Sequence, residues 1–308
     1  MIFAVADAHC DYLYGAMQRG YDMYSPKPMQ CLTKERLRAG GVALQCFAAW
    51  VDTGLRSTPS MQLVQMLDRY HSLLESDSDF VPFTQDYSPS SGKIACLLTI
   101  EGGEAIDGSL AALRNAYRLG VRAMTLTWNE NNELADCAVG KRQRGLTALG
   151  ERVICEMARL NMALDTSHLS DRGIDEVLSL SSGAVYASHS NSRAVCNHPR
   201  NLKDEHIAAI AKRGGVVGVN FYSPELRESK QADASDVARH MAHIASVGGV
   251  ECCCVGSDFD GMVRYPPDLS SSADLQRLCL ELARKGFSDR DIYRIMYQNL
   301  AGFLRSLV

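Results

Sequence analysis

Short apolar runs that alternate with helical segments constrain the fold of this chain more than any other feature. Eight runs are rich in β-branched or other apolar residues and have the length of single buried strands: 3–8, 42–50, 93–100, 121–128, 162–166, 184–188, 216–221 and 252–256. Between them, apolar residues return every three or four positions, as in Met61, Val64, Leu67, Tyr70 and Leu74. Strands that alternate with helices in this way are typical of a parallel sheet covered on both faces.

Eight strand–helix units in 308 residues predict an α/β fold, a (β/α)8 TIM barrel, that forms a single domain over residues 1–308. An open doubly wound sheet is the alternative, but no G-x-G-x-x-G motif follows the first run. Thr147 and Ser170 precede apolar periodic segments and predict two helix starts. No linker rich in Pro, Gly or Ser divides the chain.

Charge and cysteine content exclude several classes of protein. The chain has 32 Lys and Arg against 36 Asp and Glu, for a formal net charge of −4, which argues against a general nucleic-acid or membrane-surface binder. Charged residues, Gly or Asn interrupt every apolar stretch before the roughly 18 residues that a membrane span needs. The first residues lack the pattern of a signal peptide, and the 11 cysteines include three adjacent ones. We therefore expect reduced thiols and a cytoplasmic location.

Polar side chains follow several of the predicted strands, at the positions from which a barrel enzyme builds its site. They are three histidines and three carboxylates: His9, Asp11, Glu101, His168, His189 and Asp258. Residues two apart on a strand point the same way, so His9 and Asp11 can face one cation while Cys10 points away. Imidazoles and carboxylates are ligands of zinc-type ions, and the two oxygens of Glu101 can bridge two ions. Each residue alone has an ordinary structural explanation, but the six together predict a metal centre.

The other histidines are given structural roles. His71 and His206 lie in predicted helices, and His240 and His243 are placed on the solvated face of another helix. His198 and Asp260 stay open, because each could have a structural role or support the neighbouring site residues.

Six segments, taken in chain order, resemble the renal (membrane) dipeptidase family of zinc peptidases, peptidase family M19. They are Asp7-Ala8-His9-Cys10-Asp11, Glu101-Gly102-Gly103, Ser167-His168, Ser188-His189-Ser190, Pro199-Arg200-Asn201 and Gly256-Ser257-Asp258-Phe259-Asp260-Gly261. The resemblance spans nearly the whole chain, with one motif for each of several strands. It implies the amidohydrolase-like form of the barrel.

The resemblance also implies a site with two Zn²⁺ ions per chain. His9 and Asp11 would hold the first ion, His168 and His189 the second, and Glu101 would bridge them. Asp258 would take a proton from the bridging water and pass it to the leaving amine. Arg200 would pair with the free carboxylate of the substrate, since a planar guanidinium suits that group. Tyr222, which ends an Asn-Phe-Tyr run, would line the pocket.

The implied function is that of a zinc-dependent dipeptidase in which a metal-bridging hydroxide attacks the peptide bond of free dipeptides. Some members of the family also accept a D-residue at the C-terminal position. The resemblance suggests a homodimer, and no nucleic-acid or membrane partner is expected.

One position departs from the family pattern. Where the family has a histidine that helps to bind substrate, this chain has Trp128, whose indole can donate a hydrogen bond but cannot take a positive charge. Two alternatives therefore stay open: another binuclear metal hydrolase that acts on a lactone, ester or amide, and a non-catalytic metal-binding homologue. The H-x-D start and the E-G-G strand end favour a dipeptidase over another binuclear metal hydrolase. The presence of Asp258 and Arg200 argues against a non-catalytic homologue.

Overall fold

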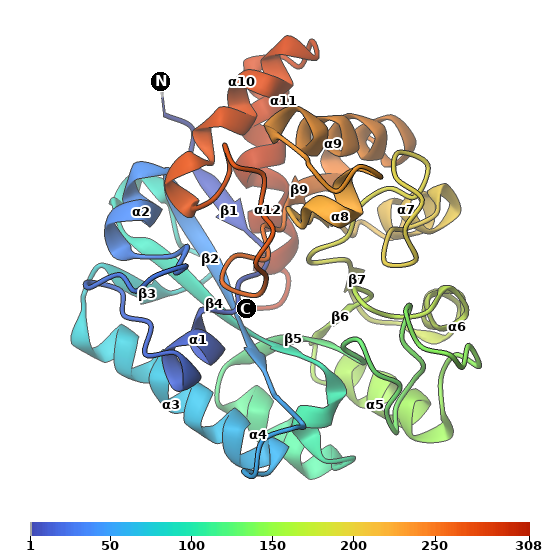
Figure 1. Cartoon of the computed structure of the whole chain (residues 1–308). Helices are drawn as coiled ribbons and strands as arrows, with labels where there is room; N and C mark the ends of the chain where they lie inside the picture. Colours follow the sequence, from blue (N-terminus) through green and yellow to red (C-terminus); the bar gives the residue numbers. More distant parts are fainter. Residues whose placement is uncertain (1) are drawn as a thin grey trace.

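In the computed structural model, which describes residues 2–308, parallel strands form a nearly closed barrel (Figure 1). The strands pair in the order β7-β6-β5-β4-β2-β1-β9-β8, and a parallel bridge between Ala187 and Val217 links β7 to β8. Their bounds are β1 Val5–Asp7, β2 Val42–Trp50, β4 Ile94–Glu101, β5 Val121–Thr125, β6 Ala163–Asp165, β7 Val185–Tyr186, β8 Val217–Val219 and β9 Cys253–Val255. The predicted barrel is confirmed. Each predicted run overlaps one of these strands, and only β4 extends beyond its run, by the single residue Glu101.

One further strand was not predicted. β3 (Phe80–Pro82) pairs with β4 outside the path of the barrel. It has only three residues, too few to show an alternation in the sequence.

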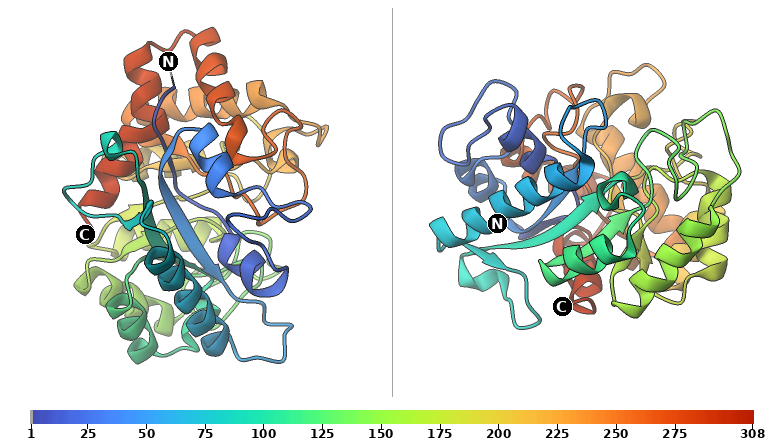
Figure 2. Two further views of the ribbon diagram at one scale, coloured as in Figure 1. Left: turned by 90° about the vertical axis from the view of Figure 1, so that its left-hand side faces the viewer. Right: turned by 90° about the horizontal axis from the view of Figure 1, so that it is seen from below.

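Helices surround the barrel (Figure 2). Their bounds are α1 Tyr12–Gln18, α2 Lys34–Ala39, α3 Pro59–Ser76, α4 Leu110–Arg118, α5 Ala148–Arg159, α6 Asp171–Leu180, α7 Asp204–Lys212, α8 Ser223–Leu226, α9 Ala234–Gly248, α10 Gln276–Arg284, α11 Asp289–Tyr293 and α12 Asn299–Arg305. Thr147 and Ser170 cap α5 and α6 through their side chains, as predicted. Within residues 2–308, no helix combines the length and apolar character that crossing a bilayer requires.

The buried face of α3 differs from the predicted one. Met61 and Val64 are 52% and 55% exposed, although the spacing placed them on the apolar face. Gln62 is buried instead, because its side chain bonds to the backbone of Asp52 and Ser57. A polar residue with its hydrogen bonds satisfied can thus lie inside, which an apolar pattern does not predict.

The C-terminal helix α12 closes one end of the barrel. Leu300, Leu304 and Leu307 belong to one cluster with side chains from several strands, among them the alanines Ala6, Ala95, Ala123 and Ala163. In Figure 1 this helix lies behind the strands, and Figure 2 shows it on the side away from α1. The polar site at the opposite end of the strands therefore rests on a closed apolar floor.

We expect Leu304→Ala to lower the free energy of unfolding by about 2–5 kcal/mol, because it leaves a cavity beneath the barrel. Leu280→Ala is the matched control, since Leu280 is 63% exposed, and its effect should stay within about 0.5 kcal/mol. Urea unfolding followed by circular dichroism measures both. Equal effects would show that α12 does not stabilise the barrel.

Candidate metal centre

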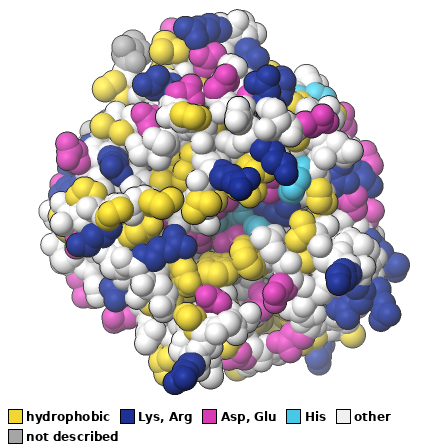
Figure 3. All heavy atoms as spheres, viewed as in Figure 1, with side chains coloured by type: hydrophobic (Ala, Val, Ile, Leu, Met, Phe, Trp, Pro, Cys, Tyr) yellow, Lys and Arg dark blue, Asp and Glu magenta, His cyan; other side chains and the backbone are white. Residues whose placement is uncertain are grey.

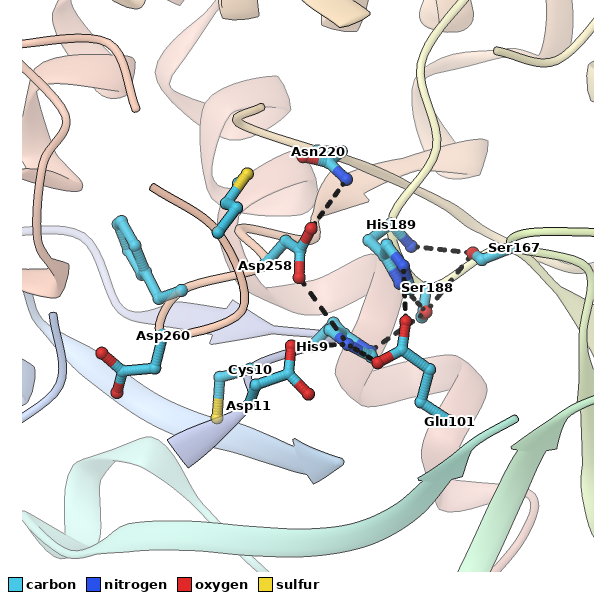
Figure 4. Close-up of polar contacts among 12 residues, drawn as sticks. His9, Cys10, Asp11, Glu101, Ser167, Ser188, His189, Asn220, Asp258 and Asp260 are labelled. Atoms are coloured by element: carbon cyan, nitrogen blue, oxygen red, sulfur yellow. Dashed lines mark hydrogen bonds and ion pairs between the residues drawn. The ribbon is translucent and has the colours of Figure 1, made fainter. Parts of the chain in front are cut away.

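The six predicted side chains meet at the carboxyl ends of the strands. Figure 3 shows acidic and histidine side chains in a hollow at the centre of the face that it presents. Glu101, at the end of β4, contacts the imidazoles of His9, His168 and His189. Figure 4 shows it beside His9 and His189. Its Oε1 is 2.9 Å from Nε2 of His168 and 3.4 Å from Nε2 of His189. Its Oε2 is 3.5 Å from Nε2 of His9. One carboxylate thus contacts side chains that follow three other strands.

Asp11 and Asp258 complete the cluster on the other side of His9. Nε2 of His9 is 3.6 Å from Oδ2 of Asp11 and 3.9 Å from Oδ1 of Asp258. Gly261 allows this approach, because a Cβ at that position would lie 2.1 Å from Oδ2 of Asp11 and 2.6 Å from Oδ1 of Asp258. Cys10 points away, and its Sγ lies 3.3 Å from the backbone oxygen of Cys46.

Hydrogen bonds orient two of the imidazoles. Nδ1 of His168 lies 2.9 Å from Oδ1 of Asn129, and Nδ1 of His189 lies 2.7 Å from the hydroxyl of Ser188. An oxygen at Nδ1 favours the tautomer whose Nε2 carries a free lone pair. Both Nε2 atoms face Glu101, so these partners prepare them to bind a cation.

Two carboxylates beneath the cluster tie the strand ends together. Oδ1 of Asp165 accepts hydrogen bonds from the backbone N–H groups of Ser167 and Ser188. Asp7 accepts bonds from the backbone and the hydroxyl of Ser257. These bonds fix the residues next to His168, His189 and Asp258, and burial raises the pKa of both carboxyls.

The charges in the cluster are strongly coupled. Burial opposes the charge of His9, but the charges and hydrogen bonds of Glu101 and Asp11 raise its pKa well above the usual value. Burial lowers the pKa of His168 to about 4, helped by the charge of Arg200. Burial also raises the pKa of Asp11 to about 6 and that of Asp258 well above its usual range, with the neighbouring carboxylates adding to both. Cations bound at the centre would offset the repulsion between these carboxylates.

The donor set fits divalent metal ions. Nε2 of His9 and Oδ1 of Asp11 are buried and have no hydrogen-bond partner among the described residues. The nitrogen and oxygen atoms of His9, Glu101 and His189 lie close enough to share one ion, and those of His9, Asp11 and Asp258 do so as well. Imidazole and carboxylate ligands suit zinc. The assignment of individual ligands to two ions stays a prediction.

A cavity of about 390 Å³ opens above the cluster. The three residues predicted to bind substrate, Trp128, Arg200 and Tyr222, all line it together with Asp258. Arg200 is 5% exposed, and its Nη2 donates to the backbone oxygen of His189. The indole of Trp128 packs against Trp50 with 4.8 Å between ring centroids and forms an apolar wall.

Several polar residues of the site were not predicted. Asn129 orients His168, Asn220 donates to Oδ2 of Asp258, and Glu225 lines the cavity beside Arg200. The carboxylate of Asp165 interrupts an apolar run, a signal that could have identified it. Asn129 lies in a loop, where no periodicity separates it from its neighbours.

The structure shows the surroundings of His198 and Asp260, whose roles the sequence left open. Nδ1 of His198 accepts from the backbone N–H of Arg200, and Asp260 lines the cavity while its Oδ1 accepts from the backbone N–H of Cys31.

Three site residues have a backbone conformation that non-glycine residues rarely adopt. Asp258, Asp260 and His168 have φ values of 59°, 68° and 68°, in the left-handed region. Such backbone costs on the order of 1 kcal/mol or more per residue and is typical of functional sites.

The solvated position predicted for His240 is wrong. Its ring is fully buried between the backbone N–H of Ser192 and the backbone oxygen of Leu226. His243 is half-buried and pairs with Asp204 of α7, and His206 pairs with Asp175. These partners come from other elements, so spacing along one helix did not predict them.

Comparison with known proteins agrees with this geometry. The sequence pattern of the membrane dipeptidase family (peptidase family M19) matches residues 2–307. Dipeptidase 3 of Mus musculus is 33% identical over 281 residues, 89% of this chain and 57% of that protein, so the chain spans somewhat more than half the length of this relative. An uncharacterized dipeptidase of Schizosaccharomyces pombe is 34% identical over 292 residues, 86% of this chain and 69% of that protein.

Solved structures match over the whole chain. A metallopeptidase described as dipeptidase AC has a TM-score of 0.91 with 26% identity, covering 100% of this chain and 99% of its own. A metallopeptidase from Rhodobacter sphaeroides, liganded with a phosphinate mimic of the dipeptide L-Ala-D-Ala, has a TM-score of 0.92 with 25% identity over 100% of both chains. Sequence pattern, curated relatives and structures agree: this chain belongs to the membrane dipeptidase family, peptidase family M19.

Proposed function

We propose that the protein is a zinc-dependent dipeptidase that hydrolyses the peptide bond of free dipeptides. The observation that carries this proposal is that Arg200 and Asp258 line the same cavity as Glu101 of the cluster. A non-catalytic metal-binding protein would need neither the carboxylate of Asp258 for proton transfer nor the guanidinium of Arg200 for a substrate carboxylate. The dipeptide mimic bound by the Rhodobacter sphaeroides neighbour supports the same substrate class.

Two zinc ions are proposed as the cofactors, held by His9 and Asp11 on one side, by His168 and His189 on the other, and bridged by Glu101. When bound, a pair of such ions supplies a nucleophilic hydroxide near neutral pH and polarises the scissile carbonyl. The protein positions these ligands before the ions arrive, because Asn129 and Ser188 already orient two of the imidazoles.

Asp258 is proposed to move the proton. Asn220 donates to its Oδ2, which leaves Oδ1 for proton exchange with the attacking water and the leaving amine. Burial and the neighbouring acids raise the pKa of this carboxyl, so it holds a proton more readily than an exposed aspartate does. A leaving amine must be protonated before the carbon–nitrogen bond breaks, and Asp258 is positioned to donate that proton.

Arg200 is proposed to bind the free carboxylate at the C-terminal end of the dipeptide. Its side chain is buried in the cavity wall, and the bond from Nη2 to the backbone of His189 fixes its distance from the metal ligands. A fixed distance between carboxylate site and metal centre selects substrates with a single peptide bond. Trp128 and Tyr222 are proposed to contact the substrate from the walls.

Purified protein should contain two zinc ions per chain by elemental analysis. Removal of the metal with a chelator should abolish dipeptide hydrolysis and lower the midpoint of thermal unfolding, because ions that bind only the folded chain stabilise it. Re-addition of zinc should restore both. Fewer than two ions after reconstitution would contradict the proposed centre.

Asp258→Asn should lower kcat for Ala-Ala by about 10²- to 10⁴-fold with the zinc content unchanged, since the amide cannot transfer the proton. The control is Asp175→Asn, whose carboxylate pairs with His206 away from the cavity, and it should keep the wild-type rate. Undiminished turnover by zinc-loaded Asp258→Asn would show that another group moves the proton.

Arg200→Lys should raise KM for free dipeptides by about 10- to 100-fold, because a charged hydrogen bond to the substrate is lost. The same substrates with an amidated C-terminus provide the control: their KM should differ little between the wild type and the variant. If both series weaken equally, Arg200 acts on the fold of the site and not on the carboxylate.

The stereochemical range and the cellular setting are further proposals. Release of amino acids from matched L-L and L-D dipeptides would show whether a C-terminal D-residue is accepted, as the ligand of the Rhodobacter sphaeroides neighbour suggests. If zinc-loaded protein cleaves no dipeptide of either series, the substrate is another amide, ester or lactone, and Trp128 is the first residue to examine. We also propose a cytoplasmic location, because the 11 cysteines are free, and a homodimer, because the family resemblance suggests one.

A further inference from the structure

Glu225 is a buried acid in the wall of the cavity that the proposed reaction does not use. It lies in the short helix α8 (Ser223–Leu226), its residue is 4% exposed, and it lines the cavity together with Arg200 and Tyr222. Its backbone is fixed on both sides. The N–H donates to the backbone oxygen of Tyr222, and the carbonyl accepts from Nδ2 of Asn201. The carboxylate is therefore held in one place relative to the site.

This carboxylate lacks hydrogen-bond donors. Its Oε1 lies 3.9 Å from Nε of Arg200 and 3.8 Å from Nδ1 of His198, both beyond hydrogen-bond distance. Its Oε2 is buried without any partner among the described residues. Burial raises the pKa of the carboxyl, and the charge of Arg200 opposes that rise. An acid in such a position costs free energy unless a donor reaches it, and the cavity is the side from which a ligand can bring one.

The position of Glu225 indicates which part of a dipeptide it meets. Arg200 lies between the metal cluster and Glu225, since its Nη2 bonds to the backbone of His189 while its Nε faces Glu225. If Arg200 holds the substrate carboxylate and the metal centre holds the scissile carbonyl, the N-terminal amine lies on the far side of the metals. The part of the substrate nearest to Glu225 is then the side chain of the C-terminal residue.

We propose that Glu225 is a specificity-determining residue that selects dipeptides whose C-terminal residue carries a cationic side chain. This inference rests on the proposed dipeptidase function and deepens it. A cationic side chain would give the buried carboxylate a charge-assisted hydrogen bond. An apolar side chain of the same length would leave Oε2 without a hydrogen-bond donor. The competing explanation is that Glu225 only holds Arg200 in place, in which case its loss would affect all dipeptides equally.

The test compares two substrates that differ in one charged group, Gly-Lys and Gly-norleucine, each with the L and the D form of the C-terminal residue. The readout is the ratio of kcat/KM for the lysyl substrate to that for the norleucyl substrate. We expect a ratio of at least about 10 in the wild type, which is the value of one favourable charged hydrogen bond. In Glu225→Gln, which keeps the shape and removes the charge, the ratio should fall by about 10-fold.

The matched control is Glu104→Gln. Glu104 is a half-buried acid just after β4 whose pKa is also raised by burial, but it does not line the cavity. The Glu104→Gln variant also removes one negative charge near the cluster. Its ratio of kcat/KM for the lysyl to the norleucyl substrate should equal that of the wild type. Zinc content and thermal unfolding of each variant are measured on the same samples.

The outcomes separate this inference from the function on which it rests. A wild-type ratio near or below one, or a ratio that Glu225→Gln leaves unchanged, overturns the role of Glu225 even though dipeptides are cleaved. The wild-type ratio decides the question alone if Glu225→Gln does not fold. If zinc-loaded protein cleaves neither substrate nor any other dipeptide, the proposed function fails and this inference fails with it.

Discussion

The arrangement of this protein depends on one carboxylate, that of Glu101, which is shared by three imidazoles. The three histidines follow β1, β6 and β7, and Glu101 ends β4, so the contact joins strands from both halves of the barrel. The burial of a carboxylate among imidazole nitrogens is energetically favourable only when the geometry is fixed and the net charge is balanced. The rest of the site supplies the first condition, and bound cations would supply the second.

The fixed geometry is built from the strand ends themselves. Asp7 and Asp165 gather backbone N–H groups beneath the cluster, where the parallel strands have ended and no ladder partner remains. Below this polar layer several strands contribute alanines, and leucines of α12 pack against them. A rigid apolar floor and a hydrogen-bonded layer together support the residues that carry the predicted metal ligands.

Much of the barrel and of the predicted metal centre could be predicted from the sequence, because the relevant patterns lie within short segments. Buried parallel strands appear as apolar runs, and the polar residues directly after them must lie at one mouth of a barrel. The prediction failed where tertiary contacts decide. His240 is buried because Leu226 and Ser192 offer partners that no helical spacing shows, and Gln62 replaces Met61 on the buried face of α3 for the same reason. Glu225 gave no signal, since a single acid in a four-residue helix forms no pattern.

The distribution of thiols has a consequence for how the metal centre is assembled. All 11 cysteines are free, and only Cys155 is exposed, so the folded chain offers a zinc ion hardly any sulfur ligand outside the core. The unfolded chain offers all of them, and thiolates bind zinc tightly. If the centre binds zinc, as proposed, zinc that meets the unfolded chain also binds thiols that belong in the core, and this binding reduces the gain in stability from the proposed site. Folding before metal loading avoids this competition, because the folded chain hides these thiols.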